Sequence, residues 1–171
     1  AAELANLLAR ARRESAVPVA YADVWEFWLR HADALRPHVD VVAAHVLPYW
    51  EDEPVAIEQA VLHVAAVNAK IRAFFAPLPV FIAETGWPAA GRQRGAAVPG
   101  KLEQARFIRE LLARQDGALH YNLIEGFDQP WKRQLEGAMG GYWGLFAADG
   151  TQRVRLNGPM VADPVWWYLP L

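Results

Sequence analysis

The sequence lacks cysteine, a surplus of charge of one sign, and long apolar runs. Without cysteine, disulfides, thiolate metal sites and thiol nucleophiles are excluded. The 171 residues carry 17 Lys and Arg against 19 Asp and Glu, a net charge of −2. This balance excludes a generally basic nucleic-acid-binding protein, which needs clustered Lys and Arg to neutralise phosphates. No apolar run approaches the roughly 18 residues of a membrane-spanning helix.

Hydrophobic residues are abundant instead. They make up 54% of the chain and charged residues 21%, a composition typical of a packed globular protein rather than a disordered one. A chain of this length is expected to form one domain, here over residues 1–171. Eight tryptophans and twelve prolines are the unusual features.

Helical and strand-like segments alternate along the sequence. Apolar spacing predicts helices over residues 2–14, 23–35 (with Asp23 as a cap), 54–75 and 101–115. Continuous apolar runs predict buried strands ending near Ala22 and over residues 39–46, 79–84 and 120–127. The remainder, from Asp128, is rich in glycine and predicted to be mostly irregular.

This alternation predicts an α/β fold with a parallel sheet, either an open doubly wound sheet or part of a (β/α)8 barrel. No glycine-rich nucleotide-binding motif follows any predicted strand, which disfavours the open sheet. A complete barrel usually takes about 250 residues, so four strand–helix units supply half of one.

Carboxylates and large aromatic residues follow the predicted strands. In parallel α/β folds the carboxyl ends of the strands carry the functional groups. Aromatic rings stack on sugar faces and carboxylates bind hydroxyls or cleave acetals, so the combination indicates carbohydrate chemistry. The residues are His45, Tyr49 and Trp50 after the second strand, Glu84 and Trp87 after the third, and Glu125, Gln129, Trp131 and Lys132 after the fourth.

Several segments resemble glycoside hydrolase family 17, the β-1,3-glucanases and β-glucan transglycosylases. FIAETGWPAAG at residues 81–91 resembles its nucleophile segment, and HVLPYWED at 45–52 its sixth strand. YNLIEGFDQPWK at 121–132 is similar to the eighth strand and EGAMGGYWGLF at 136–146 to the glycine-rich loop. The resemblance covers roughly residues 18–150 and is closest to the bacterial and fungal branch.

The resemblance implies that Glu84 is the nucleophile of a retaining enzyme, which forms a covalent glycosyl-enzyme. Gln129 stands where many relatives have glutamate. Neither a cofactor nor a metal is expected, since no histidine pair has ligand spacing. The residues expected to bind substrate are His45, Tyr49, Trp50, Trp87, Glu125, Gln129, Trp131, Lys132, Glu136 and Trp143, with Trp50, Trp87, Trp131 and Trp143 as sugar platforms.

The family's acid/base is the glutamate of an Asn-Glu pair after the fourth strand, and this sequence contains no Asn-Glu. A retaining glycosidase needs two carboxyl groups. The chain is therefore expected to be the carboxyl-terminal half of the barrel, inactive alone. Its partners would be β-glucan and either the missing amino-terminal half or a second copy that completes the sheet.

Alternatives remain open. A non-catalytic β-glucan-binding module, or a decayed barrel with a structural role, would also retain these aromatic residues. Arg92 and Arg94 are expected in a solvated loop. Bacterial relatives are often fused to membrane glycosyltransferase modules, which implies a periplasmic or membrane-attached location. Trp166, Trp167 and Tyr168 would then lie at a membrane interface, or else pack against the barrel bottom.

Overall fold

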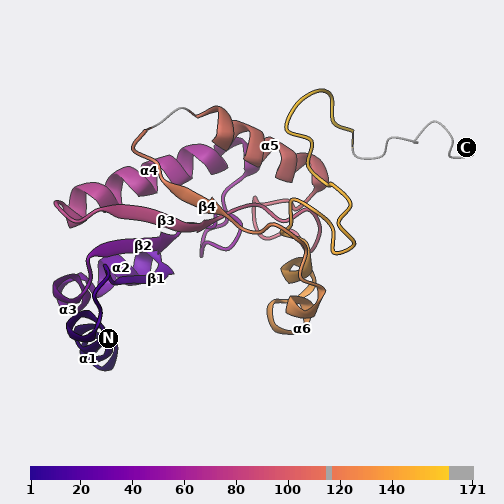
Figure 1. Cartoon of the computed structure of the whole chain (residues 1–171). Coiled ribbons are helices and arrows are strands. Elements are labelled where there is room, and N and C mark those ends of the chain that lie inside the picture. Colours follow the sequence, from indigo (N-terminus) through magenta and orange to yellow (C-terminus); the bar gives the residue numbers. More distant parts are fainter. Residues whose placement is uncertain (115–116, 162–171) are drawn as a thin grey trace, which may run out of the picture. The chain divides into compact units, whose positions relative to one another are not determined.

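The computed structural model describes residues 1–114 and 117–161 (Figure 1). Its centre is a parallel sheet of four strands in the order β1-β2-β3-β4. Each strand pairs with the next one along the chain, as in a (β/α)8 barrel. The strands are β1 (Ala20–Val24), β2 (Val41–His45), β3 (Val80–Thr85) and β4 (Tyr121–Leu123).

Helices separate the strands along the chain. Two long helices, α4 (Ile57–Phe75) and α5 (Lys101–Ala113), provide the β2-to-β3 and β3-to-β4 connections. The other helices are α1 (Ala2–Glu14), α2 (Trp25–Arg30), α3 (Ala32–Leu35), η1 (Arg36–His38), η2 (Pro130–Lys132), α6 (Arg133–Glu136) and η3 (Ala138–Gly141). Four parallel strands alternating with helices make this part of a (β/α)8 barrel, as the sequence predicted.

The chain divides into two compact units, each built from three separate stretches. Unit 1 contains the whole sheet. Unit 2 contains the segments that follow the carboxyl ends of β2, β3 and β4, together with α5. Unit 1 comprises residues 1–47, 62–85 and 116–123, and unit 2 comprises residues 48–61, 86–115 and 124–171.

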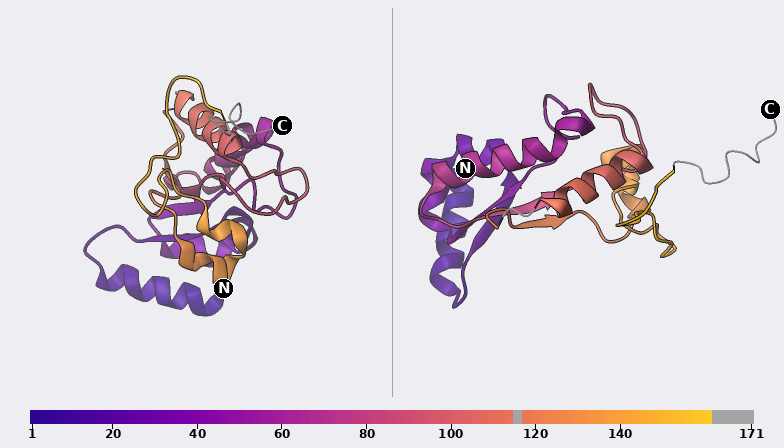
Figure 2. Two further views of the ribbon diagram at one scale, coloured as in Figure 1. Left: turned by 90° about the vertical axis from the view of Figure 1, so that its right-hand side faces the viewer. Right: turned by 90° about the horizontal axis from the view of Figure 1, so that it is seen from above.

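The core of unit 1 is built around Trp28, which is fully buried. Its indole Nε1 donates a hydrogen bond to the backbone oxygen of Ala43 in β2, at 2.9 Å. The ring of Phe75 packs edge-on against it, with centroids 5.6 Å apart. Helix α1 packs beside α3 near the amino terminus, as labelled in Figure 1, and Figure 2 shows this end of the chain from two further sides. The contacts of the indole bury Trp28 of α2 and Phe75 of α4 and join α2 to β2.

Most of the predicted elements are confirmed, with shifted boundaries. The helix predicted at residues 23–35 is two short helices, and within the described part of the chain no side chain caps α2. Asp23 instead lies in β1, where its carboxylate accepts a hydrogen bond from the hydroxyl of Tyr21. The strand predicted at residues 120–127 ends at Leu123, because the following backbone pairs with the loop at 143–146.

Over residues 1–114 and 117–161, no helix combines the length and the apolar character needed to cross a membrane. The expected interfacial residues Trp166, Trp167 and Tyr168 lie outside the described residues.

Candidate functional site

Glu84 is the next-to-last residue of β3 and lies beside His45, the last residue of β2. The backbone oxygen of Glu84 accepts a hydrogen bond from the amide of Val46 at 2.9 Å, which joins the two strand ends. The carboxylate oxygen Oε2 lies 3.5 Å from Nδ1 of His45. The Glu84 side chain remains 41% exposed and that of His45 22%. Unit 1 therefore presents an accessible carboxylate steadied by one imidazole.

The polar pair in β1 has a different environment. The Tyr21 hydroxyl is bonded to Asp23, and its ring contacts those of Phe27 and Trp28, with centroids 6.3 and 5.7 Å away. Burial, the hydrogen bond to Asp23 and the charge of Asp23 together raise the pKa of Tyr21 to about 12. This tyrosine stays protonated at neutral pH and packs against α2.

Three of the five aromatic residues expected to bind substrate in unit 2 form a core instead of a surface. Tyr49, Trp87 and Trp143 are all buried. The Tyr49 ring meets those of Trp87 and Trp143 edge-on, at centroid distances of 6.2 and 6.0 Å. The expectation that Trp87 and Trp143 are sugar platforms is corrected here, because their faces are covered by protein. Their size and edge-on geometry suit them to hold the loops together.

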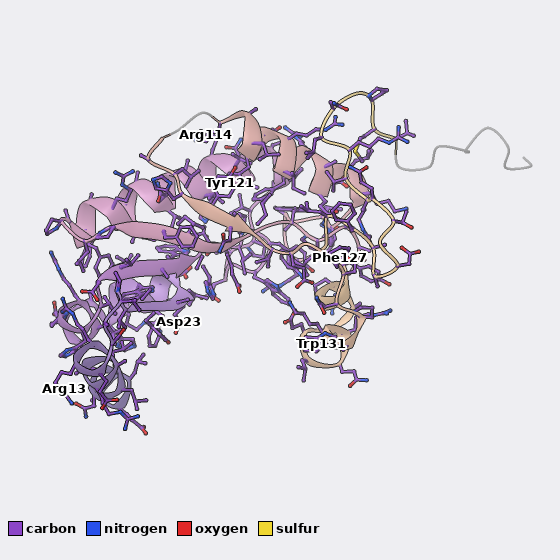
Figure 3. The ribbon with its side chains drawn as sticks, viewed as in Figure 1. Arg13, Asp23, Arg114, Tyr121, Phe127 and Trp131 are labelled. Atoms are coloured by element: carbon purple, nitrogen blue, oxygen red, sulfur yellow. The ribbon has the colours of Figure 1, made fainter. Side chains whose placement is uncertain are left out.

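Among the described residues of unit 2, Trp131 is the most exposed aromatic side chain, at 58% (Figure 3). Its indole Nε1 donates a hydrogen bond to Oε1 of Gln129 at 2.8 Å. The ring is thus held by its edge while it remains open at the surface. Trp50 is half-buried and lies in the loop after β2.

Glu125 and Lys132 form an ion pair in unit 2, with 2.6 Å between Oε2 and Nζ. Both side chains are largely buried. The other carboxylate oxygen, Oε1 of Glu125, is buried without a hydrogen-bond partner among the described residues. An acceptor of this kind can accept a hydrogen bond from a ligand hydroxyl. Glu136, at the end of α6, is exposed.

The sequence interpretation missed a buried polar cluster centred on Asp128. Its Oδ1 accepts the backbone amide of Gly144 at 2.9 Å, and its Oδ2 pairs with Arg153. The side chain of Gln104 in α5 donates to the backbone oxygens of Trp143 and Gly144, at 3.1 and 3.3 Å. The cluster fixes the glycine-rich loop. Nothing local in the sequence marks it, since the partners are separated by 16 to 40 residues.

In the described ranges, no group of three or more His, Cys, Asp or Glu side chains is placed to hold a metal ion.

Residues 1–144 match the family described as BtgE/BtgC glycoside hydrolase domain.

Two curated relatives illustrate the similarity. The probable beta-glucosidase btgE of Aspergillus fumigatus is 33% identical over 119 residues, which are 70% of this chain and 20% of that protein. The glucan 1,3-beta-glucosidase of Candida albicans is 24% identical over 153 residues, 84% of this chain and 49% of that protein. The chain thus spans about one fifth to one half of the length of these relatives.

Among solved structures, the glycoside hydrolase family 17 beta-1,3-glucanosyltransferase from Rhizomucor miehei superimposes with a TM-score of 0.79 at 22% identity. The match covers 90% of this chain and 57% of that one. An endo-laminarinase from Formosa matches with a TM-score of 0.61 at 21% identity, over 88% of this chain and 49% of that one. At this identity the likeness is one of fold, which agrees with part of a (β/α)8 barrel.

Proposed function

The chain belongs to the BtgE/BtgC glycoside hydrolase domain family, and from this membership we propose that it forms the nucleophile-bearing part of a retaining, β-glucan-active enzyme. Residues 1–171 would be one partial barrel domain. The substrate would be a β-1,3-glucan, in keeping with the names of its relatives. The single observation that carries the proposal is the accessible carboxylate of Glu84 at the carboxyl end of β3.

In the proposed reaction, the Glu84 carboxylate attacks the anomeric carbon of a glucosyl unit. A covalent glycosyl-enzyme forms as the bond to the leaving oxygen breaks, and a general acid protonates that oxygen. A water molecule or a sugar hydroxyl then attacks the anomeric carbon, loses its proton to the same acid/base, and releases Glu84 with retention of configuration. His45 would position the nucleophile through the 3.5 Å contact.

The acid/base is proposed to come from outside these residues. A retaining enzyme holds its two carboxyl groups about 5–5.5 Å apart. The family's Asn-Glu pair does not occur in this sequence, and Glu125 is engaged by Lys132. We assign Glu125 and Lys132, with Trp131 and Gln129, to the binding of sugar hydroxyls and faces. Trp50, His45 and the exposed Glu136 are the remaining proposed contacts.

The sheet offers a place for the missing part. Among the described residues no strand pairs with the outer edge of β1 or of β4. Unpaired strand edges recruit further strands, so we propose that the amino-terminal half of a barrel, or a second copy of this chain, completes the sheet. Fusion to a membrane glycosyltransferase module and membership of the bacterial branch are further proposals, which rest on the resemblance of the Glu125-to-Lys132 segment to a pattern of both bacterial and fungal relatives.

The test uses a substrate that needs no general acid. A 2-deoxy-2-fluoro-laminaribiosyl donor with a dinitrophenolate leaving group should label Glu84 covalently, detected as one added glycosyl mass on the peptide that contains it. The Glu84→Gln variant should not be labelled. Natural laminari-oligosaccharides should not be turned over by the chain alone.

The decisive arm adds the upstream half of the barrel. Turnover that appears with this half, and disappears in Glu84→Gln, supports the enzyme. Label on another residue, or no label and no turnover in the complemented protein, rejects it. Glucan binding in that case would favour the alternative, a non-catalytic binding module, which the exposed Trp131 also supports.

A further inference from the structure

Unit 2 contains a hollow of about 620 Å³ that no sequence motif indicated. Its volume lies within the range of ligand pockets, roughly 300–1,000 Å³. The lining combines an indole, a thioether, a carboxylate, an amide and two guanidinium groups. The residues that provide them are Trp50, Asp52, Arg92, Gln93, Arg94 and Met139.

The wall of this hollow is a tight turn rather than a loose loop. Arg94 and Ala97 exchange two backbone hydrogen bonds, of 3.0 and 2.8 Å. Gly95 allows the turn because its φ is +51°, in the left-handed region. The side chain of Gln93 closes it further by donating to the backbone oxygen of Gly95 at 2.8 Å. The turn therefore has a defined shape.

The turn is also anchored to the aromatic core of unit 2. The Tyr49 hydroxyl donates to the backbone oxygen of Arg92 at 2.5 Å, and the indole Nε1 of Trp87 donates to the backbone oxygen of Val98 at 3.1 Å. Gly91 lets the chain pass close to Met139, since a Cβ at Gly91 would lie only 2.5 Å from the Met139 Cβ. A wall fixed at both ends loses little entropy when a ligand binds.

Arg94 and Trp50 form one composite surface. The guanidinium carbon lies 4.8 Å from the centroid of the Trp50 ring, and Nη1 donates to the backbone oxygen of Tyr49 at 3.0 Å. This stacking fixes the indole from one side. Arg92 and Gln93 are exposed next to it and carry planar groups that hydrogen-bond well to hydroxyls.

We propose that this hollow is a carbohydrate-binding subsite built around Trp50, which holds a glucosyl residue of a neutral β-glucan chain. The inference rests on the proposed function and adds Asp52, Arg92, Gln93 and Arg94 to it as binding residues. The apolar CH face of the sugar would contact Trp50 and Met139. The hydroxyls would be bound by both donors and acceptors, since Asp52 accepts while Arg92 donates.

The test is a titration of the full chain with laminarihexaose. Binding is measured by calorimetry and by two-dimensional NMR of the amides at residues 91–95. Trp50→Ala should weaken the binding monitored by these amides at least tenfold, and Gln93→Ala by a smaller factor of three to ten. Arg92→Ala should behave like Gln93→Ala. Arg10→Ala, a change of an exposed arginine in α1, is the matched control and should bind like the wild type.

Gln93 and Arg92 are exposed, so their variants keep the core intact even if Trp50→Ala unfolds. Unchanged affinity in Arg92→Ala and Gln93→Ala would overturn the proposal. So would a tenfold preference for an oligoglucuronate over laminarihexaose, which would indicate an anion site. The labelling experiment on Glu84 distinguishes the two proposals. If Glu84 is never labelled but glucan binding still depends on Gln93, the binding site is supported and the proposed enzyme function is rejected.

Discussion

Asp128 and Arg153 form an ion pair inside unit 2, with their side chains only 5% and 13% exposed. The same carboxylate accepts the amide of Gly144 through its other oxygen. One side chain thereby connects the segment after β4 to the glycine-rich loop and to the stretch that follows it. The stability of unit 2 should depend on this pair.

Asp128→Asn removes the charge and leaves Arg153 buried without its partner. Breaking a buried pair from one side typically costs about 3–5 kcal/mol, and the urea midpoint of the variant should fall accordingly. As a control, Asp128→Asn combined with Arg153→Met removes both charges and keeps a side-chain oxygen that can accept the Gly144 amide. Its loss should be clearly smaller than that of the single change, and an equal loss would contradict the argument.

Gly144 should tolerate no side chain. A Cβ there would overlap the backbone nitrogen of Asp128 and the backbone oxygen of Phe146. Neither atom can move without breaking the loop, so Gly144→Ala should lower the free energy of unfolding by about 3 kcal/mol or more. Gly126→Ala is the matched control, since a Cβ at Gly126 meets nothing within 4 Å. Thermal unfolding of both variants checks the difference.

Tyr21 should titrate late. Its pKa is raised from 10.0 to about 12, so the folded chain holds this proton more tightly than the unfolded chain. The stability that the folded chain gains from this difference in pKa is therefore complete below pH 10 and is lost as the pH rises toward 12. Absorbance at 295 nm, compared between the wild type and Tyr21→Phe, isolates this tyrosinate. Asp23→Asn should lower the Tyr21 pKa, though not to 10, because burial is the largest cause. Ionisation of Tyr21 near pH 10 in the wild type would disprove the assignment.

Trp131 should bind glucan through a ring that Gln129 holds in place. Trp131→Ala should reduce the affinity for laminari-oligosaccharides by about one kcal/mol or more, the scale of a single stacking contact. Gln129→Leu, which removes the acceptor, should show part of that loss. Gln129→Glu keeps an acceptor and should restore binding, as measured by quenching of tryptophan fluorescence. Equal binding by Gln129→Leu and the wild type would leave Gln129 without this role.

The parallel sheet was predictable because continuous apolar runs such as VDVVAAHV have few alternatives in a chain with alternating helices. The boundaries of the individual helices and strands were less predictable. Aspartate is a residue type favoured at helix N-caps, yet Asp23 lies in β1, because pairing with β2 opposite Ala44 extends the strand past it. Its carboxylate accepts a hydrogen bond from the Tyr21 hydroxyl instead.

The candidate site was likewise predictable only in part. Glu84 could be placed at a strand end because an apolar run stops at a Thr-Gly-Trp-Pro turn. Its role as nucleophile rests on the resemblance of this segment to the family and stays a prediction. Exposure could not be predicted from tryptophan itself: Trp87 and Trp143 are buried while Trp131 is not. Those outcomes depend on Tyr49 and Phe107, which pack against the first two rings from distant parts of the sequence.

The chain passes between its two units five times, at residues 47/48, 61/62, 85/86, 115/116 and 123/124. No single cleavage can separate them, and every terminal truncation that reaches past one of these junctions removes material from both. Function cannot be mapped on this chain by trimming its ends. Exchanging whole segments between junctions, such as 86–115, is the way to transplant one set of loops onto another sheet.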